Sequence, residues 1–145
     1  MAFRTLNEQE MRGLLSEQRV VRVGFDAAGH RYLLPFGYIW LHGNLYGATS
    51  PGRKTQMAEQ NAQVSFQIDN AQVPWEWQSV TGEGVFELVT DPTEIEQAGS
   101  VLQARFSDMP EWFQQEQASK AAAGELFVWR IRPSSMTGRE HGPDA

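Results

Sequence analysis

The sequence contains no cysteine among its 145 residues and only three histidines. The missing thiols exclude disulfide bridges, thiolate metal sites and a cysteine nucleophile. No two histidines have the H-x-x-x-H spacing of a metal-binding helix, so we expect no metal site. The G-x-S-x-G elbow of hydrolases and the G-x-x-x-x-G-K-[ST] phosphate loop are also absent. Hydrolase chemistry therefore has no support in the sequence.

Long apolar runs and an excess of positive charge are absent as well. No segment approaches the ~20 apolar residues that cross a membrane, and the first residues lack the apolar core of a signal peptide. We therefore expect a cytoplasmic protein without membrane partners. Because 12 Lys and Arg stand against 18 Asp and Glu, the net charge is −6, which argues against a nucleic-acid partner.

Length and composition are typical of one globular domain. Hydrophobic residues make up 41% and charged residues 21% of the chain, and a chain of 145 residues can bury a core without disulfide bridges. We expect one domain over residues 1–137 with an N-terminal helix, followed by a polar C-terminal tail over residues 138–145.

Alternating apolar and polar residues predict six strands, and helix-capping patterns predict four helices. Short turns between the first three strands favour antiparallel pairing. Pro35 should lie on an edge strand or at a bulge, and Gly82 and Gly84 should mark a second irregularity. The pattern predicts a mainly β protein with helices (α+β), folded as a small closed or split antiparallel barrel. The expected strands cover residues 19–25, 31–41, 44–49, 64–69, 79–90 and 125–132, and the expected helices cover residues 6–17, 51–60, 92–105 and 109–123.

The segment between the third strand and the second helix combines hydroxyl and cationic side chains. We expect Ser50 to cap this helix and Pro51 to be its first residue. Free N–H groups at a helix N-terminus attract anions, and nearby hydroxyls and cations favour a phosphate group. Thr49, Ser50, Arg53 and Lys54 are therefore a candidate phosphate site. On local spacing alone, a capped helix with a solvated cationic face explains these residues equally well.

The second strand is rich in aromatic residues, which either line a cofactor groove or fill the core. A core position is favoured for Phe36 and Trp40. Pro35 and Gly37 interrupt the run of aromatic residues. They expose backbone that can contact a flat heterocycle. The sequence therefore predicts that one strand contributes both to the core and to a binding groove.

In their order along the chain, several segments resemble the pyridoxamine 5′-phosphate oxidase-related family, the FMN-binding split barrels. They are the strand pair at residues 21–25 and 32–36, the segment over residues 43–54, the helix end and strand over residues 60–66, and residues 77–84. The resemblance covers residues 6–137 and implies a six-stranded antiparallel split β-barrel.

The resemblance also implies a homodimer that holds two FMN cofactors between its subunits. Arg53 and Lys54 would bind the FMN phosphate, helped by Ser50 or Thr49. The flavin ring would contact the backbone of one strand, two small residues of the next, and one hydroxyl. These residues are Leu34, Pro35 and Phe36, then Gly47 and Ala48, then Ser79.

The chain departs from two groups within the resemblance. Residues 135–141 have no equivalent of the residues with which the vitamin B6 oxidases bind the substrate phosphate. Gly47 stands where relatives resembling nitroimidazole reductases carry a histidine. We therefore expect neither of these two activities.

Three functions remain open from the sequence. The first is an FMN-dependent oxidoreductase acting on a small organic substrate, with no side chain assigned to catalysis. The second is a non-catalytic carrier of flavin or haem. The third is a β-barrel interaction domain in which Arg53 and Lys54 are only surface charge. Some split barrels bind haem or the deazaflavin F420, and the short phosphate cluster favours FMN.

Trp75 and Trp77 lie in a predicted loop. They are either buried or part of a self-association surface, and we favour the surface.

Overall fold

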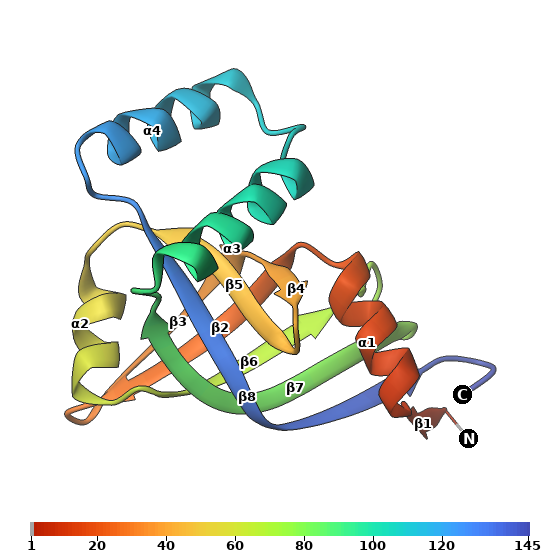
Figure 1. Cartoon of the computed structure of the whole chain (residues 1–145). Coiled ribbons are helices and arrows are strands. Elements are labelled where there is room, and N and C mark those ends of the chain that lie inside the picture. The colour runs from red at the N-terminus through yellow and green to blue at the C-terminus, as the bar shows by residue number, and fades with distance from the viewer. Residues whose placement is uncertain (1) are drawn as a thin grey trace.

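The computed structural model describes residues 2–145, and its centre is an antiparallel sheet that curls into a half-open barrel (Figure 1). Seven strands follow the order β3-β2-β6-β7-β8-β5-β4, and β1 pairs with the end of β8 outside this path. The strands are β1 (Phe3–Thr5), β2 (Val20–Ala27), β3 (His30–Gly37), β4 (Ile39–Leu41), β5 (Asn44–Thr49), β6 (Gln63–Asp69), β7 (Trp77–Leu88) and β8 (Phe127–His141).

Two tight hairpin turns join β2 to β3 and β4 to β5. Ala28 and Gly29 have φ angles of 52° and 78°, and His42 and Gly43 have φ angles of 51° and 79°. Two successive positive φ angles are typical of type I′ turns, whose twist matches that of the flanking strands. The antiparallel pairing predicted for this part of the chain is confirmed. Pro35 lies in β3, at one end of the strand order, as predicted for a proline within a sheet.

Four helices join this sheet within the described residues: α1 (Glu8–Glu17), α2 (Arg53–Gln60), α3 (Pro92–Arg105) and α4 (Glu111–Ala122). Asn7 starts α1 through a capping box, and the carboxylate of Asp91 caps α3. α3 lies against β4 and β5, whereas α4 stands away from the sheet and buries none of its side chains (Figure 1). No helix in the described part of the chain is long and apolar enough to cross a membrane.

The interior of the barrel is filled by side chains that alternate along the strands. Val21 and Val23 of β2 are completely buried, and Trp129 of β8 is the largest side chain in this core. The indole ring of Trp129 stacks on Phe86 at a centroid distance of 5.5 Å and meets the edge of Phe36 at 5.3 Å. Phe36 therefore contributes to the core, as predicted.

The structure contains eight strands where the sequence predicts six. β1 is only three residues long, which gives too short a pattern to detect. The strand predicted over residues 31–41 is divided into β3 and β4 at Tyr38, whose side chain is fully buried. The Tyr38 hydroxyl donates a hydrogen bond to the Leu15 carbonyl at 2.7 Å, so this residue anchors α1. The long strand β7 changes register between Glu83 and Gly84, which confirms the predicted irregularity.

The predicted polar tail over residues 138–145 is also corrected. β8 continues to His141, so residues 138–141 belong to the sheet and pair with β7, while the last of them also pair with β1. The extension is not predicted from the sequence because most of the side chains after Pro133 are polar, so they lack the apolar alternation of a strand. Gly138 fits closely against Met11 of α1, where an added Cβ would lie 2.6 Å from the Met11 Cγ.

Candidate functional site

The first turn of α2 is open to an anion. The helix begins at Arg53 with Gly52 as its N-cap, which corrects the prediction that Ser50 caps it and that Pro51 is its first residue. Gly52 donates its N–H to the Thr55 hydroxyl at 2.9 Å. Within the described residues, the N–H groups of Arg53 and Lys54 have no acceptor. Such groups bind anions because they carry the positive end of the helix dipole.

Arg53 and Lys54 also lack carboxylate partners within the part of the chain that the structure describes. Most other cationic side chains form ion pairs, for example Arg4 with Glu10 and Arg130 with Glu94. In a chain of net charge −6, two adjacent cations without a carboxylate partner produce a local positive potential. This potential is what a phosphate group requires.

The two cations lie over the aromatic residues of β3. The Arg53 guanidinium carbon lies 4.8 Å from the centroid of the Tyr32 ring, and the Lys54 Nζ lies 5.9 Å from the centroid of the Phe36 ring. Burial lowers the pKa of Lys54, and the charge of Lys120 lowers it further. The start of α2 is therefore positioned beside the strand that carries Pro35, so the residues predicted for the phosphate and for the ring lie on neighbouring elements.

The outer edge of β3 is not covered by another strand, and its free backbone groups can be assigned. Tyr38 donates its N–H to the Arg19 carbonyl at 3.0 Å. Because bonded and non-bonded pairs alternate along antiparallel strands, the even-numbered residues of β3, such as Leu34, direct their backbone toward β2. Leu33 and Pro35 therefore direct theirs toward the free edge, where proline's missing N–H costs nothing.

The predicted residues of β5 alternate between the interior and the surface. Gly47 is buried, and a Cβ added there would lie 2.6 Å from the Gly37 carbonyl and closer still to the Trp129 ring. Ala48 is exposed, whereas Thr49 is buried with its hydroxyl donating to the Ser50 carbonyl at 3.3 Å. Contact of Gly47 and Ala48 with a flavin stays a prediction.

Ser79 lies apart from the other predicted residues. It pairs with Asp69 at one end of β6, whereas α2 leads into Gln63 at the other end. The two ends of this seven-residue strand are six residue steps apart, which corresponds to about 20 Å. The Ser79 hydroxyl accepts a hydrogen bond from the Gln67 amide at 3.1 Å. Within one chain, Ser79 therefore does not complete the site at α2.

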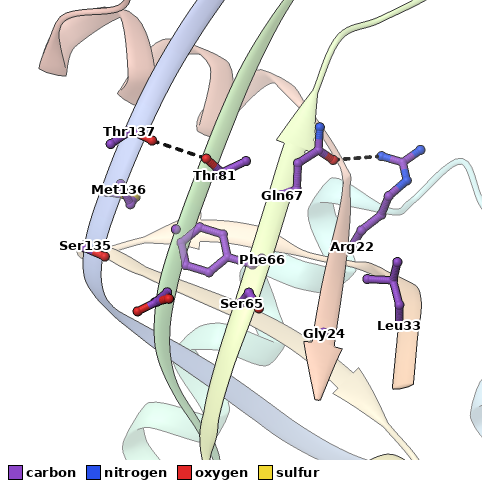
Figure 2. A pocket seen from close by; sticks show the side chains of 12 residues that line it. Arg22, Gly24, Leu33, Ser65, Phe66, Gln67, Thr81, Ser135, Met136 and Thr137 are labelled. Carbon is purple, nitrogen blue, oxygen red and sulfur yellow. Dashed lines mark hydrogen bonds between the residues drawn. The ribbon is translucent and has the colours of Figure 1, made fainter. Parts of the chain in front are cut away.

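The outer face of the sheet carries a groove of about 540 Å³ that the sequence analysis did not find. It crosses five strands, and Figure 2 shows Arg22 and Leu33 at one side, Gln67 on the middle strand, and Thr81 and Thr137 at the other side. The only available signal was the run of small residues at alternating strand positions, which is too weak to separate a groove from an ordinary exposed face.

No acid or base is assigned among the residues predicted for cofactor binding or their neighbours Tyr38 and His42. Tyr38 is committed to its hydrogen bond with Leu15, and burial raises the pKa of its hydroxyl. His42 lies exposed in the β4–β5 turn. None of the ten residues predicted for cofactor binding is a histidine or a carboxylate. The arrangement suits the binding and orientation of a group that supplies its own reactivity.

These features define a split barrel with a candidate anion site at the N-terminus of α2. The chain belongs to the family described as pyridoxamine 5′-phosphate oxidase, which matches residues 7–140. Members of this family bind flavins. No curated protein matches the sequence.

Solved structures confirm the fold over nearly the whole chain. An FAD-binding protein from Mesorhizobium loti is 27% identical, with a TM-score of 0.81 over 98% of this chain and 100% of that one. The FAD-binding protein from Mycobacterium smegmatis is 19% identical, with a TM-score of 0.67 over 94% of this chain and 96% of that one. The haem storage protein HutZ from Vibrio cholerae is 16% identical, with a TM-score of 0.71 over 95% and 98%.

Proposed function

We propose that this protein binds FMN through its phosphate group and acts as an FMN-dependent oxidoreductase on a small organic substrate. The observation that carries the proposal is the pair Arg53 and Lys54. Both lack carboxylate partners within the described residues, and both belong to a helix turn whose N–H groups lack acceptors. A phosphate monoester has charge and acceptor oxygens that match both features.

The free edge of β3 supports the placement of the flavin ring. The pyrimidine edge of a flavin offers hydrogen-bond acceptors and a donor, and the odd-numbered residues of β3 offer backbone groups directed away from β2. Arg53 and Lys54 lie over Tyr32 and Phe36 of the same strand. A ligand held by its phosphate at α2 would therefore extend along this edge.

A bound flavin supplies the electron-transfer chemistry. The chain's own residues would hold the phosphate and orient the ring along the free edge of β3. No side chain is assigned to proton transfer, because no histidine or carboxylate is among the residues placed at the site. FMN is favoured over FAD because the cluster is short and suits one terminal phosphate.

We also propose that the protein is a homodimer with its cofactor sites between the subunits. Ser79 lies about 20 Å along β6 from the α2 end, so its predicted contact with the flavin requires a second chain. The groove on the outer face is a suitable contact surface. Leu33 is 70% exposed there, and Arg22 and Glu83 line the groove on different strands.

The charges in this groove are self-complementary. Glu83 forms no ion pair within the described residues, and Arg22 reaches Asp69 and Gln67 only at 3.4 Å. In a two-fold contact every pairing between two different residues occurs twice, so Arg22 of each copy can pair with the partner's Glu83. Such a contact would enclose the groove between two copies.

Titration of the purified protein with FMN tests the proposed cofactor. Flavin fluorescence should be quenched on binding, and riboflavin, which lacks the phosphate, should bind more weakly. Absence of binding with either flavin would contradict the proposal. FAD serves as the comparison for cofactor choice, because tighter binding of FAD would overturn the choice of FMN but keep flavin binding.

A non-catalytic flavin carrier is the second candidate function. It is favoured by the lack of any acid or base among the predicted site residues. The two functions differ in turnover. The oxidoreductase is supported if NAD(P)H rapidly reduces the bound flavin and an added organic acceptor then reoxidises it. The carrier is supported if the bound flavin undergoes neither reaction.

A further inference from the structure

The chain has only two lysines, Lys54 and Lys120, although it has ten arginines. Lys54 is the second residue of α2, and Lys120 lies in the last turn of α4. Fifty residues separate these two helices in the sequence. The fold nevertheless brings the segments that carry both lysines to one end of the sheet.

The strand register explains this proximity. Thr49 pairs with Phe127 where β5 and β8 adjoin. β5 leads from Thr49 into α2 within four residues, and α4 leads from Lys120 into β8 within seven. The start of α2 and the end of α4 are therefore attached to the same strand pair, and Figure 1 shows both on the same side of the molecule.

Two backbone hydrogen bonds fix the segment that connects α4 to β8. Glu125 donates its N–H to the Lys120 carbonyl at 2.8 Å, and Gly124 donates to the Ala121 carbonyl at 3.1 Å. Gly124 has a φ of 70°, which is typical of a glycine that ends a helix. No side chain of α4 is fully buried, and Phe113, Gln117 and Lys120 are half-buried.

The local charges are unbalanced. Glu116 is the carboxylate that pairs with Lys120, at 2.9 Å, and none pairs with Arg53 or Lys54 within the described residues. The charge of Lys120 acts on Lys54, whose pKa it lowers together with burial. Among these four side chains, three cations and one carboxylate leave an excess of two positive charges. A phosphate monoester carries about two negative charges near neutral pH, which would balance this excess.

We propose that Lys120 is a third cation of the phosphate site, carried by α4. The inference rests on the proposed function, namely that a flavin phosphate binds at the start of α2. A lysine ammonium on its long flexible stem can approach a phosphate as a point charge. Glu116 competes with the phosphate for Lys120, so it should weaken binding.

The first test compares FMN with riboflavin in three variants. Lys120→Gln should weaken FMN binding about five- to tenfold and leave riboflavin binding unchanged. Glu116→Gln should tighten FMN binding at low ionic strength, again without effect on riboflavin. Lys120→Arg keeps the charge and should retain most of the FMN affinity. Flavin fluorescence titration measures all three.

The outcomes separate this inference from the proposed function. If Lys120→Gln binds FMN as tightly as the unchanged protein, while Arg53→Ala with Lys54→Ala loses affinity, the role of Lys120 is wrong and the phosphate site stands. If the unchanged protein does not prefer FMN over riboflavin, the phosphate site itself is wrong.

Lysine chemistry gives a second test without mutation. Reductive methylation followed by peptide mass spectrometry reports on each of the two lysines, and the α-amino group serves as the internal reference. FMN should slow methylation of both Lys54 and Lys120, and riboflavin should slow it much less. Equal methylation of Lys120 with and without FMN, while Lys54 is protected, would overturn the inference.

Discussion

The indole ring of Trp129 packs directly against the backbone of Gly47, its partner in the register of β5 and β8. A side chain at position 47 would overlap that ring and would also lie 2.6 Å from the Gly37 carbonyl. Trp129 is completely buried and stacks on Phe86. The glycine therefore allows β5 to pass over the largest side chain of the core.

Gly47→Ala should destabilise the protein. The Gly37 backbone and the packed indole ring cannot move aside easily, so the added methyl group overpacks the core. We expect the free energy of unfolding, measured by urea denaturation, to fall by about 1–3 kcal/mol. Gly13→Ala is the matched control. Gly13 lies within α1 with open space at its Cβ, so the control should stabilise the protein by about 0.5–1 kcal/mol. Equal stability of both variants would contradict this account of the core.

Arg53→Ala combined with Lys54→Ala should remove most phosphate recognition. We expect FMN binding to weaken by about 2 kcal/mol, roughly thirtyfold, because two charge-assisted contacts are lost at a partly exposed site. Riboflavin binding should change little. Arg12→Ala, an exposed cation of α1 that pairs with Glu8, is the control and should bind FMN normally. A double variant that keeps its preference for FMN would show that these cations are only surface charge.

Charge reversal tests the proposed dimer contact. Arg22→Glu alone and Glu83→Arg alone should each place like charges together and shift the protein toward monomer. The double reversal restores opposite charges and should recover the dimer. Light scattering after size-exclusion chromatography measures the mass. If the unchanged protein is a monomer, or if each single variant dimerises normally, this contact is not used.

The ion pair of Glu94 and Arg130 should make stability depend on pH. Hydrogen bonds from Tyr46 and Arg130 lower the pKa of Glu94, with Nη1 of Arg130 at 2.7 and 2.8 Å from the carboxylate oxygens. A lowered pKa in the folded state contributes stability above the unfolded-state pKa, and this contribution is lost as pH falls through the folded-state value.

Glu94→Gln should therefore cost about 1–2 kcal/mol at neutral pH, and the difference from the unchanged protein should shrink in acid. Thermal unfolding followed at several pH values measures the change. Glu96→Gln is the control, since Glu96 neighbours Glu94 on α3 and forms no ion pair within the described residues. If the stability difference between Glu94→Gln and the unchanged protein is the same below pH 4 as at neutral pH, the charge of Glu94 does not contribute to stability.

Much of the fold is readable from local pattern. Alternation along residues 64–69 and the capping position of Asp91 predict β6 and the start of α3 because each depends on neighbouring residues only. The end of β8 is not predictable in this way. Its polar residues after Pro133 are held by pairing with β7 and β1, which lie far away in the sequence.

The candidate site also has one part that local sequence predicts and another that depends on contacts between distant segments. The adjacent residues Arg53 and Lys54 are visible as a cationic cluster, and the structure places them beside β3. The sequence places the helix start two residues too early, because Ser50 and Pro51 are common at helix starts, whereas Gly52 caps this helix without a side chain. Lys120 cannot be placed from the sequence, because the pairing of β5 with β8 brings α4 to this end of the sheet.

The most direct test of the central claim is the ratio of the dissociation constants of riboflavin and FMN for the unchanged protein. If a phosphate group is held at the start of α2, FMN should bind at least about tenfold more tightly than riboflavin, and the preference should fall as salt is added. Equal affinities for the two flavins at low ionic strength would contradict the claim.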